Sequence, residues 1–202
     1  MSLLGKLRRP DWLGELQGVL TLGLVATSLA IAVSVGRALL GDLPVTAGIP
    51  AGALEGSTVI PGRTTGGVSI TPDSVIEVEI ADPSAHQLVA AVLTALPSLL
   101  VALGMLVMLL LVVRRARRGD PFTTQAVRRL RLLAVFVIVG GTLAGVTESA
   151  AALDLALSVS DTAGVTVWEF PAAWTLAGFG ILASAEVVSR GAGMRAELET
   201  VI

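Results

Sequence analysis

Four long apolar segments dominate this sequence and constrain its fold more than any other feature. They cover about residues 16–39, 87–113, 132–153 and 172–189. A helix needs about 20 mainly apolar residues to cross the hydrocarbon core of a bilayer, and each segment meets this requirement. The composition agrees, because only 15% of the residues are charged, whereas a soluble domain carries about 25%. The sequence therefore predicts an all-α membrane protein, a single four-helix transmembrane bundle over residues 1–202.

Basic residues are concentrated on one side of these spans. Seven of them fill the loop 114–131 between the second and third spans: Arg114, Arg115, Arg117, Arg118, Arg128, Arg129 and Arg131. With those before the first span and after the fourth, twelve of the fourteen Lys and Arg residues lie on the same side. The positive-inside rule then places both termini, the arginine-rich loop and the tail 190–202 in the cytoplasm. Thirteen arginines against one lysine are typical of a GC-rich bacterial genome, so we expect a multi-pass protein of the bacterial inner membrane.

The loop 41–86, between the first two spans, is expected on the extracytoplasmic side. Gly and Pro are frequent up to Gly67, which indicates irregular structure. Apolar and polar residues then alternate over 68–71 and again over 76–80. Because alternation is typical of strands with one apolar face, we expect a small β-hairpin over about residues 67–81.

Three prolines indicate where the predicted helices kink or start. Pro97 lies inside the second span and should kink it. Pro171 lies where a first-turn proline is tolerated, so it marks the start of the fourth span. Asp120 and Pro121 together make a favourable helix start. We therefore expect a helix from Phe122 onward that runs through the second group of arginines into the third span.

Two carboxylates lie within the predicted spans. Glu148 lies toward the outer end of the third span, where a charged group is costly and is by default a candidate for function, here proton or cation transfer. The alternative is that Glu148 lies at the outer interface beside Thr147 and Ser149. Glu186 lies near the inner end of the fourth span, and Arg190 follows it at i+4, which favours a helical ion pair near the headgroups.

The sequence predicts no catalytic, metal or cofactor site. The chain has no Cys, no Tyr and one His, so thiol chemistry and a multi-His metal cluster within one chain are excluded. Residues Gly178–Ala183 match a dinucleotide-binding pattern, but they lack the preceding strand that this motif requires. Small residues at four-residue spacing, as at Gly141 and Gly145 or Gly180 and Ser184, instead indicate close helix packing. We therefore expect no enzyme and no bound cofactor.

The arginine-rich loop has three interpretations. It can set the topology and bind anionic lipid headgroups, each arginine near the surface contributing about 1 kcal/mol. It can also dock an acidic cytoplasmic partner. Direct nucleic-acid binding is disfavoured, because no recognition fold accompanies the arginines. The residues predicted to contact a partner are Arg114, Arg115, Arg117, Arg118, Phe122, Arg128, Arg129, Arg131, Glu197 and Glu199.

Two stretches of the sequence carry a resemblance to a known family. The first is the inner loop, Arg118-Gly119-Asp120-Pro121-Phe122 followed by Val127-Arg128-Arg129-Leu130-Arg131. The second is the tail from Arg190 to Val201. With these motifs the chain resembles the bacterial membrane family catalogued as domain of unknown function 2975. The resemblance implies four spans and a cytoplasmic face that controls a partner, because members are often encoded beside a small helix-turn-helix regulator.

Two functional hypotheses follow. The first is a sensory or regulatory membrane protein that presents its cytoplasmic face to a partner such as a small transcriptional regulator, through two bundle states of different partner affinity. The alternative is a small proton- or cation-coupled transporter that uses Glu148, with Glu186 as a second relay carboxylate, as a homo-oligomer. Against transport, the sequence contains no evident pair of broken helices.

Overall fold

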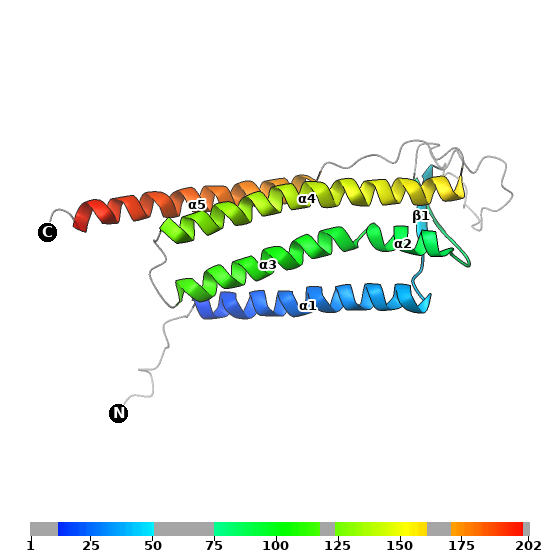
Figure 1. The fold of residues 1–202 in the computed structure, drawn as a ribbon, viewed down its shortest axis with the longest axis horizontal. Coiled ribbons are helices and arrows are strands. Elements are labelled where there is room, and N and C mark those ends of the chain that lie inside the picture. Colours follow the sequence, from blue (N-terminus) through cyan, green and yellow to red (C-terminus); the bar gives the residue numbers. More distant parts are fainter. Residues whose placement is uncertain (1–11, 51–74, 118–123, 161–170, 200–202) are drawn as a thin grey trace, which may run out of the picture. The chain divides into compact units, whose positions relative to one another are not determined.

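The computed structural model describes residues 12–50, 75–117, 124–160 and 171–199. Its elements are α1 (Trp12–Leu40), β1 (Thr46–Pro50), β2 (Val75–Glu79), α2 (Ala85–Leu93), α3 (Leu96–Ala116), α4 (Thr124–Val159) and α5 (Ala172–Glu199) (Figure 1). Four stretches in these ranges are helical, long and apolar enough to cross a membrane: Trp12–Leu40, Ala85–Ala116, Thr124–Val159 and Ala172–Met194. The predicted fold class, a helical membrane protein with four spans and a small β-hairpin, is confirmed.

The chain divides into two compact units. Unit 1 is made of Met1–Ala30, Leu99–Thr142 and Pro171–Ile202, and unit 2 is made of Ile31–Ser98 and Leu143–Phe170. The division passes through α1, α3 and α4, so each of these helices contributes one part to each unit.

In unit 1, α3 lies between α1 and α4, and α5 lies beside α4 (Figure 1). Leu20 of α1 packs against Leu110 and Val113 of α3. The contact between α4 and α5 depends on small residues. A Cβ atom added to Gly141 would overlap Trp174, and one added to Gly178 would overlap Ile138. Close backbone approach at small residues is how spans pack when lipid offers no hydrophobic drive for association.

The predicted small-residue spacing is therefore correct at one position and incorrect at another. Gly141 is a packing position, as expected, because its Cα faces Trp174. Gly180 has no atom within 4 Å of an added Cβ, so in the described chain it is Gly178 that permits the close approach on α5. Spacing alone could not choose between two glycines that lie two residues apart on different faces of one helix.

Large apolar side chains remain exposed along the spans. Leu22 is 70% exposed, Leu176 is 70% exposed and Val187 is 71% exposed. A soluble monomer rarely exposes such continuous apolar surface. Lipid tails solvate it without cost, so these side chains are explained by a bilayer around the helices.

The second span is broken where the sequence predicts a kink. Helix α2 ends at Leu93 and α3 starts at Leu96, with Pro97 in its first turn. Proline has no N–H to donate and its ring clashes with the carbonyl four residues earlier, which kinks or interrupts a helix at this position. At its other end α2 begins with a capping box, in which Gln87 N–H donates to Ser84 Oγ at 3.3 Å and Ser84 N–H donates to Gln87 Oε1 at 2.9 Å.

Unit 2 contains the two-stranded antiparallel sheet, whose register pairs Thr46 with Glu79 and Pro50 with Val75. The second strand lies where the alternation predicts it. Its partner, however, is Thr46–Pro50, a segment that the Gly and Pro content assigned to irregular structure, and this part of the prediction was wrong. The predicted first strand at 68–71 lies outside the described residues.

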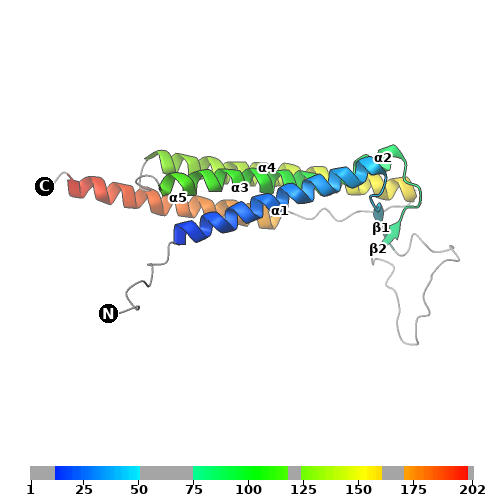
Figure 2. The same ribbon diagram turned by 90° about the horizontal axis from the view of Figure 1, so that it is seen from below.

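Strand β1, which was not predicted, has an alternating pattern of buried side chains. Val45, Ala47 and Ile49 are 1%, 2% and 2% exposed, and they alternate with Thr46 and Gly48, as a half-buried strand requires. Val45 and Ala47 pack with Ala90 of α2 and Leu155 of α4, and Ile49 packs with Ala156 of α4. Figure 2 shows both strands beside α2 and the end of α4. A lone hairpin is marginal in water, and this packing gives it the apolar support that it needs.

Helix α4 runs from Thr124 to Val159 as one continuous element. It therefore contains Arg128, Arg129 and Arg131 and confirms that the third span extends into the arginine-rich segment. The predicted helix start at Asp120 and Pro121 lies outside the described residues. Helix α5 also exceeds its predicted span and includes most of the tail.

Candidate functional site

The arginines at the end of α3 lie beside the start of α1. Arg117, which follows α3, donates from Nη1 to Gln17 Oε1 near the start of α1 at 2.7 Å. Arg114 and Arg115 lie in the last turn of α3 and are exposed. The beginning of α1 and the end of α3 are thus adjacent, which agrees with the grouping of basic residues on one side of the spans.

Glu186 of α5 contacts two arginines, one on its own helix and one on α4. Arg190 Nε lies 3.1 Å from Glu186 Oε1, which confirms the predicted i+4 pair. Arg131 Nη2 of α4 lies 3.6 Å from Glu186 Oε2. All three side chains are more than half exposed, so the pairs contribute little stability, of the order of 0–1 kcal/mol each. Their effect is to orient Arg131 toward α5.

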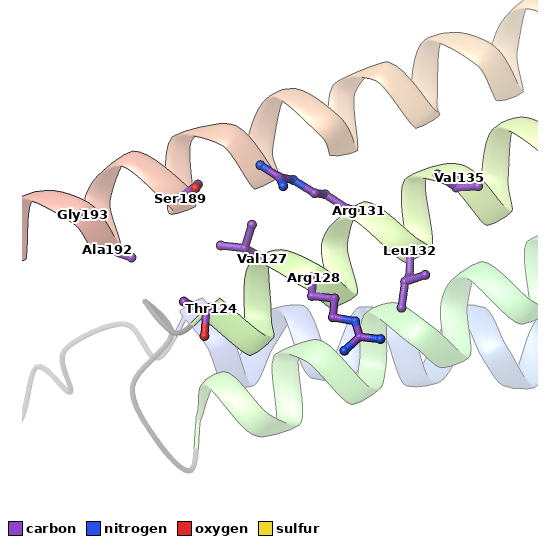
Figure 3. Close-up of a pocket in the computed structure, with 9 residues that line it drawn as sticks. All are labelled: Thr124, Val127, Arg128, Arg131, Leu132, Val135, Ser189, Ala192 and Gly193. Atoms are coloured by element: carbon purple, nitrogen blue, oxygen red, sulfur yellow. The ribbon is translucent and has the colours of Figure 1, made fainter. Parts of the chain in front are cut away.

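A groove of about 610 Å³ lies between α4 and α5 at this end. The residues that line it are Thr124, Val127, Arg128, Arg131, Leu132, Val135, Ser189, Ala192 and Gly193. We call it the α4–α5 groove. Figure 3 shows Arg131 extending toward α5, whereas Arg128 extends away from α5 on the other side of α4. Val127 is 7% exposed and forms a closed apolar part of the wall.

The remaining residues predicted to contact a partner are only partly described. Arg129 lies in the first turns of α4 and is partly buried. Arg118 and Phe122 lie outside the described residues. Glu197 and Glu199 belong to the helical backbone of α5, but their side chains lie outside the described part of the structure.

Glu148 occupies a position that its sequence context did not indicate. Ser98 N–H donates to Glu148 Oε1 at 2.7 Å and Ser98 Oγ–H donates to Oε2 at 2.9 Å. Ser98 lies in the first turn of α3, directly after the break at Pro97. The first N–H groups of a helix have no partner within that helix, and lipid supplies none. The carboxylate therefore caps a helix end that the proline break creates, with a charge that the helix dipole favours.

Neither interpretation of Glu148 from the sequence anticipated this role. The proline that breaks the span was visible, and so was the carboxylate, but fifty residues separate Ser98 from Glu148. A usable signal exists in the combination: a mid-span proline leaves unpaired N–H groups, and an intramembrane carboxylate on a neighbouring span can accept from them.

Polar contacts also connect α2 with the last turns of α4. Gln87 Nε2 donates to Ser158 Oγ at 3.1 Å, and His86 Nε2 lies 3.3 Å from Asp154 Oδ2. Among the residues that the structure describes, no group of three His, Cys, Asp or Glu side chains is placed to hold a metal ion.

Comparison with known proteins identifies one family. The model of the family described as "Protein of unknown function (DUF2975)" matches residues 74–202, which is more than half of the chain. The match includes β2, the broken second span with its Glu148 cap, and the whole arginine-bearing end of α3, α4 and α5, whereas α1 and β1 precede it. No curated protein and no solved structure matches this chain. By its family match and its four apolar helices, this multi-pass membrane protein belongs to the family of unknown function DUF2975.

Proposed function

We propose that this protein is a regulatory component of a bacterial inner membrane, which presents the arginine-bearing end of unit 1 to a cytoplasmic partner such as a small helix-turn-helix regulator. In this arrangement both termini are cytoplasmic and the sheet of unit 2 lies outside. The positive-inside rule supports the orientation, and the contacts of α1 with α3 and of α4 with α5 gather the basic residues at one end.

One observation carries the proposal. Arg114, Arg115 and Arg128 are exposed, and none of them forms an ion pair with another described residue. Arg131 and Arg190, by contrast, share Glu186. Unpaired cations on rigid helix ends attract acidic surfaces and speed encounter with them. This end of the chain therefore has the charge and the exposure that a docking surface for an acidic protein needs.

The contrast between unpaired and paired arginines gives a matched experiment. Tagged protein is purified from native membranes in mild detergent, and the co-purified proteins are identified by mass spectrometry. One variant changes Arg114, Arg115 and Arg128 to Gln. The control variant changes Arg131 and Arg190 to Gln, since these side chains already pair with Glu186. We expect a stoichiometric cytoplasmic protein with the wild type and the control, and its loss from the first variant.

The outcomes separate the proposal from its rivals. A partner retained by the first variant would show that these arginines are not the docking surface. The absence of any cytoplasmic partner from all three samples would contradict the regulatory proposal itself.

Transport is a second candidate because the structure has a broken span beside an intramembrane carboxylate. Discontinuous helices whose N-termini point at polar groups form substrate sites in many carriers. Both Glu148 oxygens, however, already accept hydrogen bonds from Ser98, which favours a structural role. Uptake assays in vesicles, with Glu148→Gln against Ser98→Ala, test it. A carrier that relays protons through Glu148 loses uptake in Glu148→Gln and keeps it in Ser98→Ala, whereas equal uptake in both rejects transport through this residue.

A further inference from the structure

The α4–α5 groove changes in chemical character along α4. Thr124, Arg128 and Arg131 lie on the first two turns, and Ser189 of α5 adds a second hydroxyl. Leu132 and Val135 follow and are each 54% exposed. The groove therefore offers cations and hydroxyl groups at one end and aliphatic surface at the other. A molecule that complements it must carry an anionic head and an apolar chain.

The charges of the groove favour an anion. Arg128 and Arg131 line it, and Arg190 lies beside Arg131 through their shared partner Glu186. Arg131 and Arg190 thus share a single carboxylate, and Arg128 adds a third positive charge nearby. Because Glu186 is divided between two arginines, it orients Arg131 without neutralising the site. Arg128 forms no ion pair with any other described residue, so no described carboxylate competes with a ligand for its guanidinium.

The position along the span favours a lipid as the source of that anion. The arginines lie where the third span begins, at the depth of headgroups if the bilayer starts at the apolar run. The aliphatic end of the groove continues into the exposed surface of α4, which acyl chains contact in any case. A soluble anion would complement the cations alone and would leave Leu132 and Val135 without a partner.

From these observations we propose that the α4–α5 groove binds one anionic phospholipid, with its phosphate at Arg131 and an acyl chain along Leu132 and Val135. Arg128 lies three residues before Arg131 on α4 and is exposed, so its side chain can turn to the same phosphate. This site differs from general attraction of headgroups to the arginine-rich loop, because it is a shaped groove with a defined stoichiometry. The lipid site shares Arg128 with the proposed docking surface, so lipid and partner would compete for this side chain. The other two docking arginines, Arg114 and Arg115, lie on α3 and do not line the groove.

The groove offers a variant that blocks it without disturbing the helices. Gly193 lines the groove, and a Cβ atom added to it meets no atom within 4 Å. Gly193→Leu should therefore fill the space with a side chain that the fold tolerates. Arg128→Gln removes one cation from the groove, and Arg115→Gln removes the same charge from the end of α3, outside the groove, as a matched control.

The test is native mass spectrometry of the full chain released from nanodiscs that contain equal amounts of phosphatidylglycerol and phosphatidylcholine. We expect one bound phosphatidylglycerol per chain in the wild type and in Arg115→Gln. Since one arginine near an anionic surface changes affinity about fivefold, we expect about fivefold less bound lipid in Arg128→Gln, and a larger loss in Gly193→Leu.

Each contrary outcome overturns the proposal in a different way. Equal loss in Arg115→Gln and Arg128→Gln would indicate diffuse charge attraction and no site. Undiminished lipid in a Gly193→Leu protein that elutes as the wild type does in size-exclusion chromatography would place the lipid elsewhere. Displacement of the lipid by millimolar inorganic phosphate would identify a site for a soluble anion, and a bound peptide in place of lipid would identify a protein dock.

Discussion

The two ends of helix α4 are held by different kinds of contact. In its first half, within unit 1, α4 meets α5 through backbone approach at Gly141 and Gly178 and through exposed ion pairs at Glu186. In its second half, within unit 2, Leu155 and Ala156 are 2% and 0% exposed beneath the sheet and α2. The first kind of contact leaves guanidinium groups exposed beside the α4–α5 groove, and the second buries aliphatic side chains beneath the sheet.

This difference indicates where ligands can bind. Buried apolar contacts and satisfied hydrogen bonds fix the architecture of unit 2, and its exposed charges in the described part include the carboxylates Glu77 and Glu79 of β2, which do not attract anions. Unit 1 combines a rigid helix pair with exposed guanidinium groups and an open groove. Binding sites need groups that are positioned but not already satisfied, and that condition is met at the arginine-bearing end.

The largest expected loss of stability comes from enlarging Gly178, where α4 and α5 approach each other closely. In Gly178→Val the new side chain overlaps Ile138, and its Cβ would lie 3.2 Å from the Ala134 carbonyl oxygen. Overpacking of this kind costs about 1–3 kcal/mol of unfolding free energy. Gly180→Val is the control, because it makes the same change on the same helix where nothing lies within 4 Å. Unfolding in mixed micelles with increasing denaturing detergent measures both, and equal stability of the two variants would contradict the assigned α4–α5 contact.

The apolar contacts of unit 2 are tested at Val45. This side chain is 1% exposed, whereas Val75 on the paired strand is 65% exposed. Val45→Ala removes two buried methyl groups and leaves a cavity, so we expect a loss of about 2 kcal/mol. The same substitution at Val75 should cost under about 0.5 kcal/mol, as exposed substitutions usually do. A reversed order would mean that β1 is not the buried strand.

Strand β1 and the preceding Val45 also show what the sequence could and could not predict. The spans, the break at Pro97 and the Glu186–Arg190 pair follow from composition and from contacts within four residues, and local pattern was sufficient for them. The alternation of Val45, Ala47 and Ile49 was present but was outweighed by the Gly and Pro content around it.

Long-range contacts were beyond local pattern. Arg131 meets Glu186 and Ser98 meets Glu148 only because separate helices pack together. Hydrophobic periodicity gives each helix a face, but it does not say which residues of two faces come opposite one another. The α4–α5 groove depends on the same packing and was not predictable for the same reason.

The cap at the broken span is the next test. In Glu148→Ala both hydrogen bonds from Ser98 are lost and its N–H is left without an acceptor, so we expect a loss of about 1–2 kcal/mol. Ser98→Ala removes one bond and keeps the bond to the backbone, so about 0.5 kcal/mol is expected. Hydrogen exchange at residue 98 gives a second measure: it should quicken in Glu148→Ala and stay slow in Ser98→Ala. An unchanged exchange rate at residue 98 in Glu148→Ala would show that Glu148 does not cap α3.

The smallest expected effects distinguish neutral from charged contacts at the start of α2. Gln87 closes the capping box and also donates to Ser158, so Gln87→Ala should cost about 1 kcal/mol. Its neighbour His86 pairs with Asp154, but the two side chains are 70% and 48% exposed. Water and salt screen such a pair, so His86→Ala should cost under about 0.5 kcal/mol. Stability measurements at low and high salt separate the two: the Gln87 effect should persist in high salt, because hydrogen bonds between neutral groups are not screened. A larger loss of stability in His86→Ala than in Gln87→Ala, which disappears at high salt, would mean that charge holds α2 against α4. The contrast between unit 2 and the arginine-bearing end of unit 1 would then be wrong.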